Sequence, residues 1–95
     1  MMQEIEELIM TRQVADQAIK EFEAGLPRES AVFLFGKVMG SKAIATEIAV
    51  PNEEDYVNRS PAYCQVSYGF LASKVPEFWD RGKDLLVGWH CHPID

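Results

Sequence analysis

The chain has 95 residues, a formal net charge of −6 at pH 7 and an apolar fraction of 47%, which is ordinary for a globular protein. This length allows one domain, at the small end of what forms an independent hydrophobic core, so residues 1–95 are interpreted as a single domain. The acidic balance argues against a nucleic-acid partner, because phosphate binding requires a basic surface.

Three features of the composition bear on the cellular compartment. The two cysteines, Cys64 and Cys91, are too few for a disulfide framework and are interpreted as reduced thiols. The acidic start of the chain, residues 1–7, does not have the character of a signal peptide. No apolar run approaches the roughly 20 residues of a membrane-spanning helix. We therefore expect a cytoplasmic protein without a membrane partner.

The first third of the chain predicts a short strand and a helix. Residues 5–10 lean apolar and favour a strand. Over residues 12–24, apolar side chains recur at the spacing of one helical face. Thr11 is suited to cap this helix, Gly25 fits the position after its end, and Pro27 prevents its continuation. The apolar face consists of Val14, Ala15, Ala18, Ile19 and Phe22.

The next segment predicts an antiparallel hairpin. Residues 30–38, Ser-Ala-Val-Phe-Leu-Phe-Gly-Lys-Val, form a continuous apolar run that is typical of a strand buried on both faces. Gly40 and Ser41 mark a turn, and the alternation over residues 42–50 predicts the partner strand. The acidic residues 52–55 are interpreted as a solvated loop.

The second half predicts a turn at residues 58–61, a strand over residues 62–67 and a helix over residues 69–81. Pro76 lies within the helical stripe, so the helix is kinked there or begins near that residue. Residues 84–90 predict a closing strand. This order of elements indicates a mixed α+β fold, in which a curved, mostly antiparallel sheet is flanked by helices.

The end of the chain carries two candidate metal ligands. Side chains two residues apart on a strand face the same way, so His90 and His92 share a face and Cys91 points to the other. Two imidazoles roughly 7 Å apart along a strand can converge on one metal ion. The pattern also fits two polar residues at a strand end. Pro93, which has no N–H to donate, ends the strand and favours the metal interpretation.

A catalytic zinc site also needs a third protein ligand and a general base near the bound water. With two histidines in the chain, the third ligand has to be Asp, Glu or Cys, and Asp95 is one candidate. Cys91 is interpreted as a core residue. Glu29 is the candidate base, because a carboxylate at the start of a buried strand is partly desolvated, which raises its pKa. Its position alone also fits a solvated loop residue.

Two segments together resemble the JAMM (MPN+) zinc metalloproteases. Residues 29–37, Glu-Ser-Ala-Val-Phe-Leu-Phe-Gly-Lys, resemble the family's strand that opens with a catalytic Glu and ends with a Gly. Residues 88–93, Gly-Trp-His-Cys-His-Pro, resemble its histidine motif. The predicted elements between the two segments match the family in length and order, so the resemblance covers nearly the whole chain.

The resemblance implies a cytidine-deaminase-like MPN core with Glu29 as general acid and base, and with His90 and His92 as Zn²⁺ ligands. It also implies a hydrolase, an isopeptidase or peptidase that acts on ubiquitin-like or sulfur-carrier-like protein conjugates. The chain departs from the family at two internal positions. Cys91 replaces a small hydroxyl residue, and Val32 stands where many members have Gly.

The largest departure is at the end of the chain. The family pattern continues with a Ser and a ligand Asp eight and eleven residues past His92, and the 95 residues contain neither position. We therefore interpret the chain as an MPN domain without its C-terminal part. It is expected to bind zinc weakly or not at all, to lack isopeptidase activity, and to form a homo-oligomer through apolar surface and an unpaired strand edge.

A non-catalytic scaffold or protein-interaction module is the alternative, because members of this fold without the ligands serve in larger complexes. The presence of Glu29, His90 and His92 together favours an enzymatic parent, since a scaffold has no physical need for all three.

Overall fold

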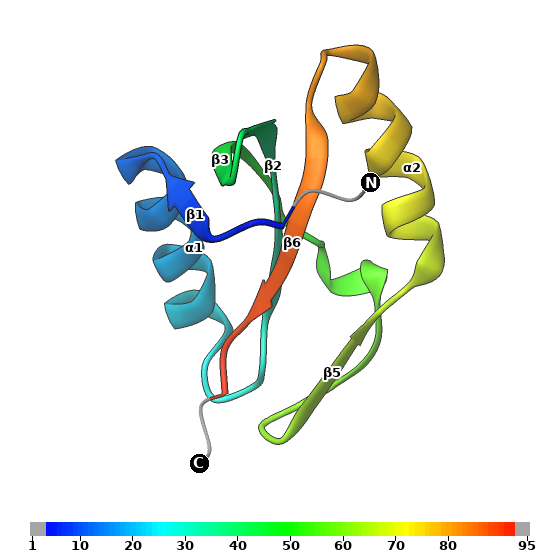
Figure 1. Cartoon of the computed structure of the whole chain (residues 1–95). Coiled ribbons are helices and arrows are strands. Elements are labelled where there is room, and N and C mark those ends of the chain that lie inside the picture. The colour runs from blue at the N-terminus through cyan, green and yellow to red at the C-terminus, as the bar shows by residue number, and fades with distance from the viewer. Residues whose placement is uncertain (1–3, 93–95) are drawn as a thin grey trace.

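A computed structural model describes residues 4–92 of the chain (Figure 1). Its elements in chain order are β1 (Glu7–Met10), α1 (Arg12–Gly25), β2 (Ala31–Met39), β3 (Lys42–Ala49), the 3-10 helix η1 (Glu53–Asp55), β4 (Tyr56–Ser60), β5 (Tyr63–Val66), α2 (Tyr68–Asp80) and β6 (Asp84–His90). One sheet has the strand order β1-β3-β2-β6, and β4 and β5 form a separate two-stranded ribbon. The pairings are antiparallel except for β1 with β3, which is parallel. The predicted mixed α+β fold with a mostly antiparallel sheet is confirmed.

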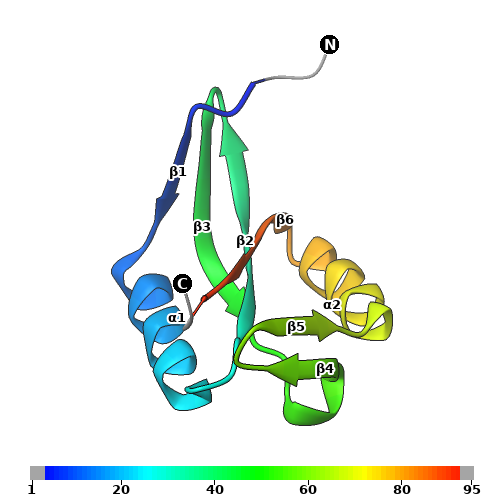
Figure 2. The ribbon, with the colours of Figure 1, turned by 90° about the horizontal axis from the view of Figure 1, so that it is seen from below.

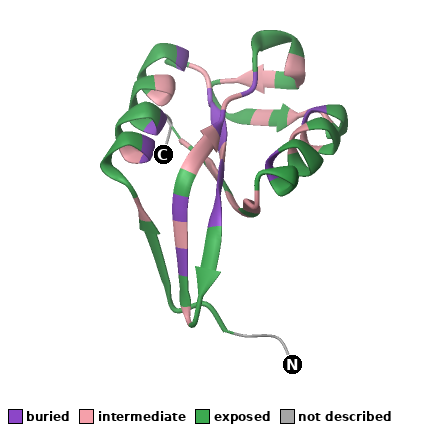
Figure 3. Ribbon diagram, turned by 90° about the horizontal axis from the view of Figure 1, so that it is seen from above, coloured by how far each residue is buried: buried purple, intermediate pink, exposed green. Residues whose placement is uncertain are grey.

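The four-stranded sheet lies between the two helices (Figure 2). Successive side chains of a strand point to opposite faces, so β2 contributes to two apolar clusters. Val32 and Leu34 pack with α1 on one face, while Phe35 packs with α2 on the other. The Phe35 and Phe78 rings are stacked, with centroids 4.1 Å apart. Burial on both faces explains the continuous apolar run at the start of β2, and Figure 3 shows buried positions in this strand, in alternation along β3 and on the inner face of α1.

Helix α1 begins and ends close to the predicted positions. The Thr11 side chain accepts a hydrogen bond from the Val14 amide at 3.2 Å and caps the helix. Gly25 is the last helical residue rather than the residue after the end, and its φ is not positive. Its role is one of packing, because a Cβ at this position would collide with the Ser30 hydroxyl and the Arg59 guanidinium.

One prediction for the middle of the chain is wrong. Residues 58–61 do not form the predicted turn, because residues 56–60 form β4 and the chain turns at residues 61–62. Residues 52–55 are largely exposed, as predicted. They contain η1, whose Glu53 accepts hydrogen bonds from Arg28 and Arg59, and these ion pairs link the segment to the start of β2.

Helix α2 begins before Pro76 and continues past it. Ser67 caps its first turn by accepting a hydrogen bond from the Phe70 amide at 3.4 Å. Gly82, with φ of 75°, follows the helix in the left-handed region that glycine adopts without strain, as expected from the sequence. No helix within residues 4–92 is long and apolar enough to cross a membrane.

Candidate metal and acid–base site

The antiparallel pairing of β2 with β6 explains why residues from distant parts of the chain meet at one site. Ala31 lies opposite His90 in the strand register, and the Cys91 amide donates to the Ser30 carbonyl at 3.1 Å. Glu29 and His92 lie two residues beyond the Ala31–His90 pair, and Oε2 of Glu29 is 3.6 Å from Nδ1 of His92. Opposite side chains in an antiparallel pair share a face and lie within contact distance. The two strands therefore bring the carboxylate and both imidazoles to one side of the sheet.

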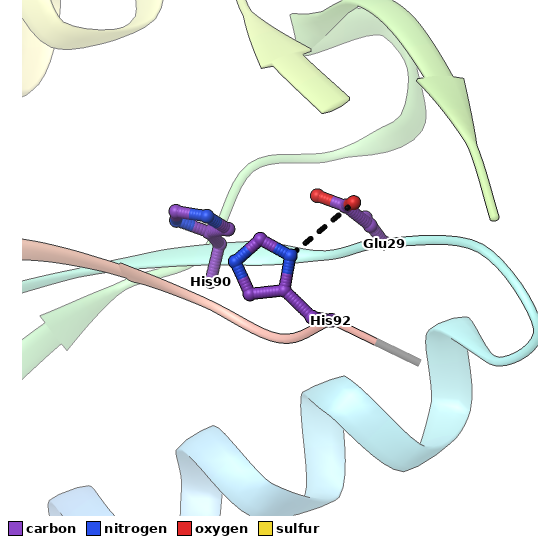
Figure 4. Close-up of side chains that lie close together, drawn as sticks. All are labelled: Glu29, His90 and His92. Atoms are coloured by element: carbon purple, nitrogen blue, oxygen red, sulfur yellow. Dashed lines mark ion pairs between the residues drawn. The ribbon is translucent and has the colours of Figure 1, made fainter. Parts of the chain in front are cut away.

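The three side chains are close enough to hold one metal ion (Figure 4). One ligand atom from each of Glu29, His90 and His92 lies within 4.8 Å of the others. The Oε2 atom of Glu29 is 3.6 Å from Nδ1 of His92, and the centroids of the two imidazoles are 4.5 Å apart. Within residues 4–92, this is the one such group of three or more His, Cys, Asp or Glu side chains. The structure thus brings together the three residues singled out in the sequence, while the roles assigned to them stay predictions.

Burial divides the site into an inner and an outer part. The Glu29 side chain is 7% exposed, whereas that of His92 is 63% exposed. Glu29 is therefore not the solvated loop residue that its position alone allowed. A buried carboxylate faces two imidazoles that are open to solvent, so a small substrate group or an ion can reach the histidines from outside.

A cavity of about 260 Å³ lies beside His90, between the sheet and the β5–α2 side of the molecule. Its lining is mainly apolar and includes Ala31, Phe33, Cys64, Val66, Leu71 and His90. Gly88 also borders this cavity, and a Cβ there would lie 3.1 Å from the Phe33 ring. Glycine at this position keeps the cavity beside the histidine open.

Sequence reasoning missed the residues that hold Glu29. The Glu29 amide donates to the Ser60 carbonyl at 2.8 Å, and its carbonyl accepts from Arg59 Nε at 2.8 Å. The Tyr56 hydroxyl accepts from the Ala31 amide at 3.0 Å. These contacts join β4 to the start of β2. These contacts were not predicted, because residues 58–61 were interpreted as a turn and no bonding partner was expected for the Arg59 side chain.

Cys64, a thiol to which the sequence assigned no role in the site, is electrostatically coupled to Glu29. Burial comes first among the causes that raise its pKa above the ordinary value, followed by the negative charge of Glu29 and a hydrogen bond with that carboxylate. Arg59 acts in the opposite direction. Because the thiolate is the reactive form of cysteine, the raised pKa makes Cys64 a slow nucleophile at neutral pH.

Replacing Glu29 by Gln is expected to increase the rate at which iodoacetamide alkylates Cys64. Loss of the carboxylate charge lowers the thiol pKa and raises the thiolate fraction, although burial still slows the reaction. The rate is measured at pH 8 by mass spectrometry in a Cys91→Ser background. Glu77→Gln serves as the control, since that carboxylate bonds Lys74 on the surface of α2. Equal rates in all three proteins would contradict the contact between Glu29 and Cys64.

Other residues considered in the sequence contribute less to the observed site. Cys91 lies between the two histidines and is half-buried rather than fully within the core. Pro93 and Asp95, the expected strand terminator and a candidate third ligand, lie outside the described residues.

Comparisons with known proteins bear on the fold. No protein-family model matches the chain, and no curated protein matches its sequence. The chain is similar to the solution structure of protein DSY2949 from Desulfitobacterium hafniense, with a TM-score of 0.78 and 19% sequence identity. The match covers 90% of this chain and 57% of that protein, so the chain spans little more than half the length of this structural relative. At this identity the likeness establishes a shared α+β fold.

Proposed function

We propose that the chain carries the metal and acid–base centre of a JAMM-type zinc-dependent peptidase or isopeptidase. The observation that supports this proposal is the meeting of Glu29, His90 and His92 on one face, with ligand atoms within 4.8 Å of one another. Imidazole nitrogens are donors that zinc favours, and the carboxylate beside them suits a base, so the residues present fit a zinc site.

In this proposal His90 and His92 hold the ion and Glu29 moves the proton. A bound zinc ion lowers the pKa of a coordinated water and polarises the scissile carbonyl. The Glu29 carboxylate accepts the proton of the attacking water and passes it to the leaving amine. Its burial suits this role, because the carboxylate is shielded from bulk water while Oε2 faces His92 at 3.6 Å.

Besides the two histidines, the proposed site needs a third protein ligand, an anionic one, and in this proposal that ligand comes from outside residues 4–92. Catalytic zinc sites generally have three protein ligands, and Glu29 cannot serve both as ligand and as free base. Candidates are Asp95, a ligand of a longer form of the protein, or a group from a second copy. If none of these groups binds, two imidazoles alone should hold zinc weakly and support no turnover.

The proposed substrates are ubiquitin-like or sulfur-carrier-like protein conjugates, and the proposed location is the cytoplasm. The cavity beside His90 gives an extended substrate segment a place next to the reacting bond. Self-association belongs to the same proposal, and a sedimentation experiment that shows a clean monomer at tens of micromolar, roughly the range of weak association, would contradict it.

One observation favours the alternative of a protein-interaction module. Helix α2 exposes large apolar side chains along one stripe, with Tyr68 at 87% and Trp79 at 66% exposure, and Val75 between them. Exposed apolar surface of this kind often marks a contact with another protein. Retention of both histidines beside a buried carboxylate still favours the enzyme.

Removal of either histidine is expected to lower the affinity for zinc by roughly 100-fold or more, since loss of an outer-shell partner alone costs about 10–100-fold. The measurement is a competition titration with a chromophoric chelator on the 95-residue chain and its His90→Ala and His92→Ala variants. Cys91→Ser, between the two histidines, is the matched control and should leave the affinity unchanged. Unchanged binding in the histidine variants would overturn the proposed ligand set.

A further inference from the structure

A single guanidinium joins the segment that carries Glu29 to two other parts of the chain. Arg59 Nε donates to the Glu29 carbonyl at 2.8 Å, Nη2 to Ser30 Oγ at 2.5 Å, and Nη1 to Glu53 Oε2 at 2.8 Å. The Arg59 side chain is 12% exposed, although Glu53 is open to solvent. A largely buried guanidinium with three different acceptors is strongly restrained in direction.

The surroundings of Arg59 are shaped to receive it. Its guanidinium lies over the Tyr56 ring, 4.3 Å from the centroid, and cation–π contacts of this kind favour arginine. Gly25 leaves the space that Nη2 and Ser30 Oγ occupy, because a Cβ there would collide with both groups. Arg28 holds the same Glu53 carboxylate from the other side, at 2.5 and 3.2 Å. Several elements therefore converge on one side chain.

We propose that Arg59 is a positioning residue that sets the place of the Glu29 carboxylate, an inference that rests on the proposed function. Glu29 precedes β2, so its main chain is not part of the strand ladder. Both of its main-chain polar groups instead bond to β4, the amide to the Ser60 carbonyl and the carbonyl to Arg59. Together these bonds fix the Glu29 backbone, and the backbone fixes where Cβ and the carboxylate point.

The expected effect of losing Arg59 follows from the sensitivity of acid–base chemistry to distance. A shift of about 1 Å in a reacting group can lower the rate by roughly 100-fold. Lysine keeps the positive charge but lacks the planar fork, so it cannot hold the Glu29 carbonyl, Ser30 and Glu53 at once. Arg59→Lys should therefore lose part of the positioning and Arg59→Ala most of it.

Arg81 provides a matched control in the same chain. Its guanidinium also lies over an aromatic ring, that of Phe78 at 4.5 Å, and also pairs with a carboxylate, that of Glu47 at 2.6 Å. It contacts neither Glu29 nor the histidines in these interactions. Arg81→Ala removes the same kinds of contact at a more exposed side chain, 51% against 12% for Arg59, so each variant is compared after correction for its own change in global stability.

The first test measures amide hydrogen exchange at Glu29 in the metal-free chain, with global stability from urea unfolding. In Arg59→Ala, exchange at the Glu29 amide should rise about tenfold beyond what the change in global stability explains. Arg59→Lys should show a smaller rise and Arg81→Ala none. Exchange that follows global stability in every variant would show that Arg59 is merely structural. If Arg59→Ala does not fold, the comparison of Arg59→Lys with Arg81→Ala decides the same question.

The second test measures kcat and KM for cleavage of a ubiquitin-like conjugate by a zinc-loaded form of the protein that has the third ligand. Arg59→Ala should lower kcat by roughly 100-fold with little change in KM or zinc content. A kcat equal to that of Arg81→Ala would overturn the inference. If a zinc-loaded form of the protein that has the third ligand cleaves no conjugate, the proposed function fails, and the exchange experiment still decides whether Arg59 places Glu29.

Discussion

Substitution of Glu29 by Gln is expected to abolish cleavage in a zinc-loaded form of the protein that has the third ligand, while zinc stays bound. Gln has nearly the same shape as Glu, so the buried position next to β2 remains filled. The amide cannot accept the proton of the attacking water or return it to the leaving amine. General acid–base catalysis contributes roughly 10²- to 10⁴-fold to rates, and kcat should fall by about that factor.

Zinc content separates this role from that of a ligand. Because Glu29 lies within 4.8 Å of both histidines, the geometry also allows it to bind the ion directly. As a base, Glu29→Gln loses turnover and keeps zinc. As a ligand, it loses both together, since a carboxamide binds zinc poorly. Glu54→Gln in η1 is the control and should change neither measurement. Full turnover in Glu29→Gln would exclude this residue from the chemistry.

The periodic parts of the sequence predicted the corresponding elements. Three patterns each depend on burial within a single element, which is a local property. They are the apolar face of α1, the apolar run of β2 and the alternation of β3. β4 was missed because Asn58, Ser60 and Pro61 have the character of turn residues. Its pairing with β5 and its bonds to Glu29 come from distant segments, so tertiary contacts outweighed local preference.

The candidate site was only partly accessible from local patterns. The alternation rule predicted that His90 and His92 share a face, and their imidazoles do lie side by side. The closeness of Glu29 followed from the family resemblance, because no local rule gives the β2–β6 register that brings the start of β2 beside His90. The role of Arg59 depends on that register, on the packing of Gly25 and on the position of η1. These three features join segments that are distant in the chain, so no local sequence pattern predicts the contacts of Arg59.

Gly36 lies inside β2, which runs to Met39, in agreement with the strand predicted over residues 30–38. The reason for a glycine there is the neighbouring strand. The β2–β3 register shifts between Phe35 and Gly36, and a Cβ on Gly36 would overlap the Ile44 carbonyl oxygen and lie 2.8 Å from its carbonyl carbon. Glycine within a strand often marks such a close approach of another backbone.

Gly36→Ala is therefore expected to destabilise the fold more than an ordinary surface change. The obstacle is main chain rather than a movable side chain, so β2 and β3 have to separate. Overpacking of a core typically costs about 1–3 kcal/mol, and we expect at least about 3 kcal/mol here. Thermal and urea unfolding measure the loss, which corresponds to a fall in Tm of more than about 10 °C for a domain of this size.

Gly69→Ala is the matched control for this substitution. Gly69 lies in the first turn of α2, has no positive φ, and a Cβ there would meet nothing within 4 Å. Alanine should raise stability by about 0.4–1 kcal/mol, because it restricts the unfolded chain and favours the helix. Gly36 also pairs with Asp84 of β6, the strand that ends at His90. Gly36→Ala should consequently weaken zinc binding as well, and a variant that keeps both its stability and its metal affinity would show that β2 and β3 are not as tightly apposed as described.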